Sequence, residues 1–142
     1  MIGKAGEHIA CADLFLSGWV ASIAAEGQGY DILAEREGRV IRIAVKSTAC
    51  ARPRRTGARD AYCFHIEKRR PVAPRRLPYT IADADVIALV AVDSRRVGYM
   101  PVGCPLLVWV FNEDAAPNER RFGPKVSCMR RFDQISLETA LG

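Results

Sequence analysis

The sequence lacks the patterns that identify a zinc centre, a disulfide framework or a nucleotide-binding loop. Its five cysteines include no Cys-x-x-Cys pair, and neither of its two histidines stands at a ligand spacing from them, which argues against a zinc site and against stabilising disulfides. No P-loop and no Gly-x-Gly-x-x-Gly motif occurs. We therefore expect reduced, mostly buried thiols in a cytoplasmic protein.

Long hydrophobic runs, internal repeats and low-complexity tracts are also missing. Residues 1–4 are not followed by the apolar segment of a signal peptide. The apolar stretch 9–25 is interrupted by Asp13 and Ser17, so it is too broken to span a membrane, and we predict no membrane partner. With 142 residues, 49% of them hydrophobic, the chain has the size of one globular domain covering residues 1–142.

Lysine is scarce, with 4 Lys against 17 Arg among the 21 basic residues. The guanidinium fork suits phosphate oxygens, which favours nucleic-acid binding, although a GC-rich genome gives the same bias. Residues 52–76 hold nine basic and two acidic residues, a net +7, while the remaining twelve basic and fourteen acidic residues give −2. The chain is thus a near-neutral body with one strongly basic segment.

Hydrophobic periodicity predicts an α/β fold. Residues 4–25 are expected to be helical, as one helix or as two that meet near Gly18, because Ala, Leu and Glu dominate them. Apolar alternation or β-branched runs predict strands at 30–34, 40–47, 61–67, 86–92 and 97–102. The run 86–92 is apolar almost throughout, as in a strand that is buried on both faces.

Turn residues and short motifs assign the remaining segments. These are a tight turn at 35–39, loops at 52–59 and 112–124, irregular proline-rich chain at 69–78, a helical turn at 81–84, a strand or buried helix at 106–111, and a terminal helix at 136–141 capped by Ser136. The sequence therefore predicts a small α/β sandwich around a mixed sheet.

Glu7 stands out because its place on the helical wheel is apolar. Ala10, Cys11 and Leu14 complete its stripe, whereas a solvated Glu is expected on the opposite side, with Asp13. A carboxylate on the buried side needs a cation or a metal ion as partner. The alternative is a first-turn Glu that the helix N-terminus stabilises.

Asp31 and Lys46 stand at the ends of the predicted hairpin. Asp31 interrupts an apolar strand, where Asp is disfavoured, unless it caps the preceding turn. Lys46 closes a hydrophobic strand on the face of Ala44; the alternative is a lysine that only solubilises an edge strand. The hairpin can bring these two ends together, and the combination is more informative than either residue alone.

Three short segments carry a family resemblance. They are Gly-Lys-Ala-Gly-Glu at 3–7, Gly-Tyr-Asp at 29–31 and Ile-Arg-Ile-Ala-Val-Lys-Ser-Thr at 41–48. Together they resemble the PD-(D/E)XK nuclease superfamily, near the Holliday-junction-resolvase-like enzymes and the group I intron homing endonucleases with a Gln-x-Lys variant. Residues 86–92 and 97–102 are similar to later strands of the latter group. The resemblance implies a small restriction-endonuclease-like sandwich, a central mixed sheet flanked by helices with the core order α-β-β-β-α-β.

The resemblance also implies a catalytic site with a divalent metal ion, Mg²⁺ or Mn²⁺. In it Asp31 binds the metal and Glu7 contributes a further ligand or holds one in place. The Val45 carbonyl adds an oxygen, and Lys46 orients or activates the attacking water. One position departs from the family: where a Glu, Asp or Gln is expected the chain has Ala44, whose methyl group cannot coordinate Mg²⁺.

The basic segment begins six residues after Lys46, so its loop is expected beside this site. Its arginines would bind the phosphates that flank the scissile bond, which gives affinity without sequence reading. They are Arg52, Arg54, Arg55 and Arg59. The alternative is a solvated loop with no ligand.

Three functions stay open at this point. The first is a metal-dependent DNA endonuclease, acting as a homodimer or higher homo-oligomer because cutting two strands usually needs two sites. The second is a catalytically decayed nuclease fold that serves as a nucleic-acid-binding or structural module, with Ala44 as its signature. The third is a small assembly protein without a nucleic-acid role, in which Glu7, Asp31 and Lys46 would not converge.

Overall fold

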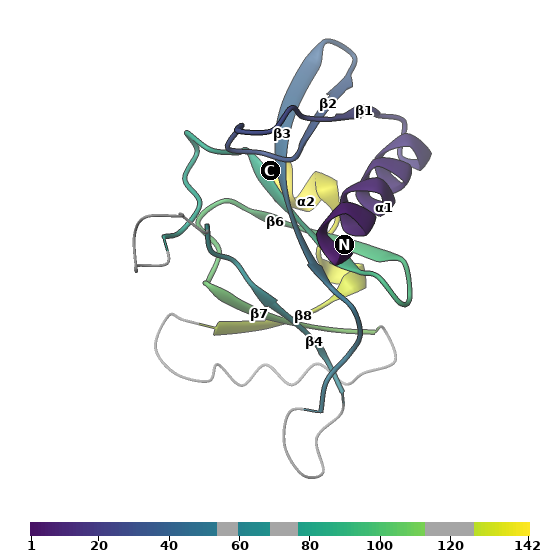
Figure 1. Ribbon diagram of the computed structural model, residues 1–142, viewed down its shortest axis with the longest axis vertical. Helices are drawn as coiled ribbons and strands as arrows, with labels where there is room; N and C mark the ends of the chain where they lie inside the picture. The colour runs from purple at the N-terminus through teal and green to yellow at the C-terminus, as the bar shows by residue number, and fades with distance from the viewer. Residues whose placement is uncertain (54–59, 69–76, 113–126) are drawn as a thin grey trace.

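Two β-sheets form the centre of the computed structural model, which describes residues 1–53, 60–68, 77–112 and 127–142 (Figure 1). The larger sheet has the strand order β1-β2-β3-β5-β6 and the smaller has the order β4-β7-β8. The elements in chain order are α1 (Ile2–Leu16), β1 (Val20–Ile23), β2 (Ile32–Arg36), β3 (Arg39–Thr48), β4 (Tyr62–His65), β5 (Val86–Ala91), β6 (Arg96–Pro101), β7 (Leu107–Phe111), β8 (Ser127–Arg131), the 3-10 helix η1 (Phe132–Gln134) and α2 (Leu137–Leu141). The predicted fold class, a mixed central sheet with flanking helices, is confirmed.

The first helix is shorter than predicted. Helix α1 ends at Leu16, and Gly18 takes a φ of +82°, a left-handed value that suits glycine and turns the chain back. Trp19 then packs into the core, 1% exposed, and Val20–Ile23 pairs with β2 as the edge strand β1. The prediction of helix to residue 25 was wrong because this tertiary pairing overrides the local helix preference.

The hairpin of β2 and β3 is where the sequence predicts it. Its turn is the pair Glu37 and Gly38, with φ values of 53° and 78°, and two consecutive positive φ values give a twist that matches antiparallel strands. The strand β2 begins only at Ile32, so Asp31 precedes it and does not interrupt it. The strand β3 then continues to Thr48 and pairs in parallel with β5.

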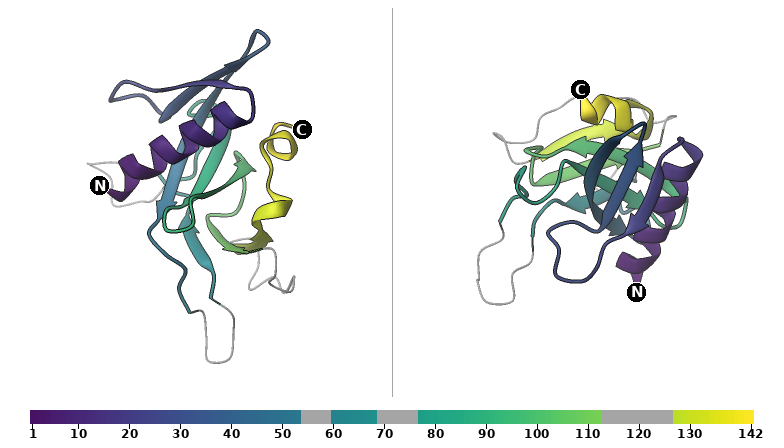
Figure 2. Two further views of the ribbon diagram at one scale, coloured as in Figure 1. Left: turned by 90° about the vertical axis from the view of Figure 1, so that its right-hand side faces the viewer. Right: turned by 90° about the horizontal axis from the view of Figure 1, so that it is seen from above.

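The strand β5 is buried on both faces, as its apolar run predicts. On one face the side chains of Val86, Ala88 and Val90 pack in a core with residues of α1 and α2. On the other face Ile87 and Leu89 pack in a second core with residues of β4, β7 and η1. The larger sheet therefore lies between α1 and the smaller sheet (Figure 2), and Leu137 of α2 packs into the core on the α1 face.

The smaller sheet differs most from the prediction. The third predicted strand, at 61–67, is the short β4, which pairs with β7 and not with the larger sheet. Residues 106–111, left open between strand and helix, form β7. The strand β8 has no counterpart among the predicted elements. The helical turn predicted at 81–84 is present as a single turn, in which the Thr80 carbonyl accepts from the Asp83 and Ala84 amides at 2.9 and 3.2 Å. The terminal helix is confirmed, with the Ser136 hydroxyl accepting a hydrogen bond from the Thr139 amide at 3.2 Å.

Two further predictions from the sequence concern membrane-spanning helices and the cysteine thiols. No helix in the parts of the chain that the structure describes is long and apolar enough to cross a membrane. The five cysteines are unpaired; four are half-buried and Cys50 is exposed, so the expectation of mostly buried thiols was wrong.

Candidate active site

Glu7 lies on the buried side of α1, as its helical-wheel position predicts. It is 8% exposed and is the one charged residue buried within the described ranges. Its Oε2 accepts a hydrogen bond from Lys4 Nζ at 2.9 Å, and the lysine is 64% exposed. The cation that a buried carboxylate requires is thus supplied, one helical turn earlier, by the same helix.

The turn of α1 that carries Glu7 lies directly against β3. A Cβ atom at Gly6 would stand 2.8 Å from the Ser47 Cβ and closer still to its Oγ. Only a glycine permits so close an approach of helix and strand. The Ser47 hydroxyl is buried there and has no hydrogen-bond partner among the described residues. This contact fixes Glu7 relative to the strand that carries Lys46.

Asp31 is held at the start of the hairpin by three hydrogen bonds. Its Oδ2 accepts from the Val45 amide at 2.7 Å, its own amide donates to the Ile43 carbonyl at 2.9 Å, and its carbonyl accepts from the Ala24 amide at 2.8 Å. The side chain therefore binds the backbone of β3 and does not cap the preceding turn. This arrangement points the carboxylate at the strand position next to Lys46.

The electrostatics of Asp31 connect it with the other predicted site residues. Burial raises the pKa of Asp31, the hydrogen bond from the Val45 amide opposes that rise, the charge of Glu7 adds to it, and the ammonium of Lys46 opposes it. Glu7 and Lys46 thus both act on the Asp31 carboxyl. The third hypothesis, an assembly protein in which Glu7, Asp31 and Lys46 do not converge, stays a prediction to be tested by experiment.

Lys46 lies in the middle of the larger sheet. Its strand β3 stands between β2 and β5, so the alternative of a solubilising lysine on an edge strand was wrong. The Nζ atom donates a hydrogen bond to the Glu67 carbonyl at 2.8 Å and lies 5.0 Å from the centroid of the Tyr79 ring. The ammonium is therefore held between a carbonyl oxygen and an aromatic ring.

Ala44, at the position where the family motif has an acid or Gln, is fully buried. Within the described ranges no three His, Cys, Asp or Glu side chains gather as a metal site would require. Glu7 and Asp31 are the two carboxylates that the sequence assigns to this site. A cation bound here would also need backbone or water oxygens.

The predicted phosphate-binding arginines fall mostly outside the described residues. Arg54, Arg55 and Arg59 lie there. Arg52 is described and exposed, and its backbone pairs with that of Ala61 through bonds of 2.8 and 3.0 Å. Arg52 comes four residues after the end of β3 in the chain.

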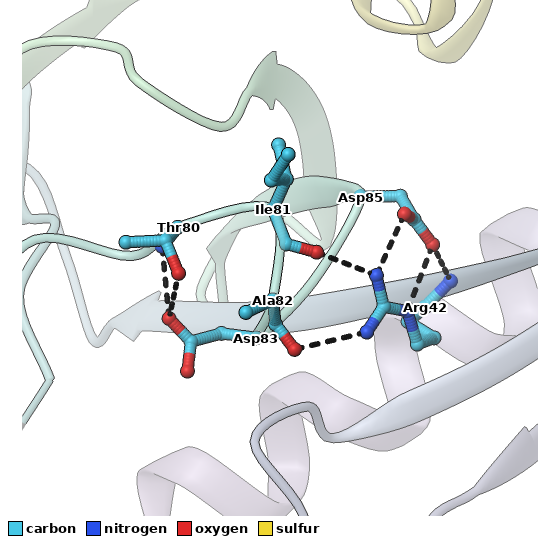
Figure 3. Close-up of polar contacts among 6 residues, drawn as sticks. All are labelled: Arg42, Thr80, Ile81, Ala82, Asp83 and Asp85. Carbon is cyan, nitrogen blue, oxygen red and sulfur yellow. Dashed lines mark hydrogen bonds and ion pairs between the residues drawn. The ribbon is translucent and has the colours of Figure 1, made fainter.

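A guanidinium clamp ties the segment after Tyr79 to β3. The Arg42 side chain donates two hydrogen bonds to Asp85, at 3.2 and 3.0 Å, and others to the carbonyls of Ile81 and Ala82 at 2.7 and 3.0 Å (Figure 3). The pKa of the Asp85 carboxyl is lowered mainly by this arginine. The clamp holds the turn that precedes β5 against the strand that bears the site.

Replacing Arg42 with Met is expected to lower the melting temperature by several degrees. The substitution removes the side-chain donors of the two carbonyls and of Asp85, which keeps only the hydrogen bond from the residue 42 amide, and the partial exposure of both side chains moderates the loss. Arg39→Met, on the exposed start of the same strand, is the matched control and should melt close to the wild type. Equal melting temperatures for the two variants would contradict the clamp.

We expect the stability that Asp83 contributes to the folded protein to be lost as the pH falls. Its ion pair with Lys68, at 2.6 Å, and its hydrogen bonds from Thr80 lower the pKa of Asp83 from 3.8 to about 2. A lowered folded-state pKa gives stability that is present above the unfolded value and is lost as the pH falls through the folded one. Urea unfolding between about pH 5 and 2 should therefore lose stability less steeply in Asp83→Asn than in the wild type. Identical slopes would contradict the ion pair.

Three contributors to this site were missed from the sequence. Lys4 stands three residues before Glu7, a helical spacing that marks it as a partner. Glu67 acts through its backbone carbonyl, and a carbonyl leaves no trace in the residue type. Tyr79 follows a proline-rich stretch without periodicity, so only the tertiary fold reveals it.

A family model described as PD-(D/E)XK endonuclease matches residues 1–106. Among solved structures, the bacterial homing endonuclease I-Ssp6803I is similar, with a TM-score of 0.63 and 17% sequence identity over 87% of this chain and 82% of that one. At this identity the likeness shows a shared fold. No curated protein sequence gives a significant match.

Proposed function

The chain belongs to the PD-(D/E)XK endonuclease family, and on that basis we propose that it is a metal-dependent DNA endonuclease that hydrolyses phosphodiester bonds. The observation that supports this most is the environment of the Asp31 carboxylate. The Asp31 carboxylate, just before β2, accepts a hydrogen bond from the Val45 amide of β3, and the charges of Glu7 on α1 and Lys46 on β3 both act on it.

In this proposal Asp31, Glu7 and the Val45 carbonyl hold one Mg²⁺ or Mn²⁺ ion. The donor set fits such an ion because it consists of hard oxygens. Burial and the neighbouring charge of Glu7 raise the pKa of Asp31, and that repulsion is what a bound cation would relieve. Mg²⁺ usually keeps several waters, so two carboxylates and a carbonyl suffice despite Ala44. A bound ion would supply an activated water and neutralise charge on the phosphate.

The remaining residues act on the DNA and the nucleophile. Lys46, held by the Glu67 carbonyl, orients the attacking water and stabilises negative charge on the phosphate. Lys4 keeps the Glu7 carboxylate in place. Arg52 and the neighbouring arginines bind the flanking phosphates. These arginines are Arg54, Arg55 and Arg59.

The phosphate contacts predict a salt-dependent affinity for DNA. In B-DNA each neutralised phosphate contributes a slope of about 0.9 to the fall of log K with log salt concentration. Arg52→Ala should therefore reduce the slope by about one unit, with little change in sequence preference. Fluorescence anisotropy across a salt series measures it. A salt-independent affinity, or a slope that Arg52→Ala leaves unchanged, would contradict the role of the arginines.

The second candidate function is a decayed nuclease that binds nucleic acid without cutting it. Ala44 and the absence, among the described residues, of a third metal-binding side chain favour it. This candidate predicts DNA binding with the same salt dependence but no cleavage. The two functions differ only in the chemistry at Asp31 and Lys46.

Cleavage of supercoiled and branched DNA with Mg²⁺ or Mn²⁺ separates the two functions. Asp31→Ala and Lys46→Ala should each lose about 100-fold or more in rate, while Asp133→Ala, an exposed acidic control on η1, should keep the wild-type rate. Equal activity in the wild type and both site variants would defeat the enzyme proposal. DNA binding without any cleavage would support the decayed nuclease.

The proposal extends to the whole protein. We place the site in a single domain covering residues 1–142, acting in the cytoplasm as a homodimer or higher homo-oligomer, because cleavage of both strands of a duplex usually needs two sites. Light scattering of the protein, alone and with DNA, measures the oligomeric state. A monomer under both conditions would remove this part of the proposal.

A further inference from the structure

Tyr79 is an aromatic residue at the site to which neither the family motifs nor the proposed chemistry assigns a role. It follows the short pairing of Lys68 with Leu77 and precedes the turn before β5. Its ring is half-buried against the core of the smaller sheet, and the face of the ring lies 5.0 Å from Lys46 Nζ. The ring thus lines the site from the side opposite α1.

The charges of two carboxylates also act on the phenol of Tyr79. Burial raises the pKa of Tyr79 to about 12, and the charges of Asp31 and Asp83 add to the rise. The hydroxyl is therefore neutral at physiological pH. The ring keeps its full aromatic character toward the lysine while its hydroxyl stands within electrostatic reach of the predicted metal ligand.

The backbone on either side of Tyr79 is anchored. On the C-terminal side, the Thr80 amide and hydroxyl donate to Asp83 at 2.8 and 3.0 Å, and Arg42 binds the carbonyls of the next two residues (Figure 3). On the N-terminal side, the Leu77 carbonyl accepts a hydrogen bond from the Lys68 amide at 2.8 Å. The ammonium of Lys68 also forms an ion pair with Asp83 at 2.6 Å. The backbone that carries the ring of Tyr79 is therefore held in place on both sides.

Taking the proposed nuclease function as its basis, we propose that Tyr79 is a positioning residue whose ring face holds the ammonium of Lys46 at the active site. A lysine side chain has four rotatable bonds, so the contacts of the ammonium, among them the hydrogen bond to the Glu67 carbonyl, decide where its charge lies. A cation over an aromatic face within about 6 Å adds a directional contact. Together the carbonyl and the ring fix the point at which the charge meets the substrate.

A different role for Tyr79 would be packing alone, as a filler beside the smaller sheet. Packing depends on the volume and apolar area of the ring, whereas positioning depends on its π-face. Tyr79→Phe keeps the face and removes the hydroxyl; Tyr79→Leu removes the face and keeps an apolar side chain. The control is Phe132→Leu, which removes another aromatic ring of the same core. Phe132 lies on η1, and the Arg96 guanidinium lies 5.1 Å from the centroid of its ring.

The kinetic test is single-turnover DNA cleavage with Mg²⁺ by these four proteins, with DNA affinity measured in parallel. Tyr79→Leu should lose about tenfold in rate with its dissociation constant within about twofold of the wild type. Tyr79→Phe should stay within about threefold of the wild-type rate, and Phe132→Leu should cleave as fast as the wild type. A Phe132→Leu rate as low as that of Tyr79→Leu, or a loss in Tyr79→Phe equal to that in Tyr79→Leu, would overturn the proposal.

Lysine-selective NMR tests the contact without using activity. The chain has four lysines, so ¹³C labelling of Lys Cε gives four signals, and Lys46→Arg assigns one of them. The ring should shift the Lys46 Hε protons upfield in the wild type and in Tyr79→Phe, and the shift should vanish in Tyr79→Leu. An unchanged signal in Tyr79→Leu overturns the contact.

The cleavage assay distinguishes failure of this inference from failure of the proposed function. A wild type that cuts no DNA overturns the proposed function together with the catalytic role. An active wild type with a fully active Tyr79→Leu overturns only the role of Tyr79.

Discussion

Replacing Asp31 with Asn is expected to abolish DNA cleavage while leaving the protein at least as stable as the wild type at neutral pH. The Asn carbonyl oxygen can still accept the hydrogen bond that the Val45 amide gives to Asp31. The amide carries no charge, so it suffers neither the cost of burying a carboxylate nor the repulsion from Glu7 that raise the pKa of Asp31. Loss of a metal ligand should reduce the cleavage rate by about 100-fold or more.

The pH dependence of the stability of Asp31→Asn provides a second readout. A folded-state pKa above the unfolded value of 3.8 means that the folded protein binds the proton more tightly, so stability falls as the pH rises from below 3.8 through the folded pKa of Asp31. The wild type should lose this stability over that window and Asp31→Asn should not. Denaturant unfolding with EDTA present measures the difference. An Asp31→Asn variant that unfolds much more easily at pH 7 would show that the carboxylate stabilises the fold and is not held there for function.

Replacing Gly6 with Ala is expected to damage both stability and cleavage. The added Cβ would stand 2.8 Å from the Ser47 Cβ, which is attached to the backbone of β3 and cannot rotate away. The helix must therefore move off the strand, which typically costs about 1–3 kcal/mol for an overpacked contact. Because Glu7 follows Gly6 directly, the same movement displaces the Glu7 carboxylate from Asp31. We expect at least a tenfold loss of cleavage rate, since misplacement by about 1 Å can cost still more.

Gly3 provides the matched control on the same helix. A Cβ at Gly3 meets no atom within 4 Å, so Gly3→Ala should stabilise α1 by up to about 1 kcal/mol through the helix preference of Ala. Its cleavage rate should equal that of the wild type. Adding Ser47→Gly to Gly6→Ala removes the clashing atoms and should restore part of the rate. A Gly6→Ala variant that behaves like Gly3→Ala would contradict the close approach of α1 to β3.

The parts of the fold that are set by local patterns could be predicted from the sequence. Gly38 indicated a turn with a positive φ, and the apolar run of β5 indicated burial on both faces. Ser136 indicated the start of the terminal helix. Glu7 could be placed on the buried side of α1 because its helical stripe is otherwise apolar. In each case the information lies within a few neighbouring residues.

The parts that depend on distant pairing could not be predicted. Val20–Ile23 is a strand only because β2 offers an open edge to it, and Ser127–Arg131 is a strand only because β7 lies beside it. The contact of Tyr79 with Lys46 joins residues 33 positions apart through a turn that Arg42 holds in place. No periodicity within any one segment encodes these contacts, because they arise when separate elements pack.

The central claim is that Glu7 and Asp31 together hold one divalent cation although Ala44 takes the place of a ligand. Titration of the metal-free protein with Mn²⁺, followed by electron paramagnetic resonance of the unbound ion, tests it most directly. The wild type should bind one ion per chain at this site, and both Asp31→Asn and Glu7→Gln should bind it much more weakly, while Asp133→Asn should match the wild type. No binding by the wild type, or equal binding by the two site variants, would contradict the claim.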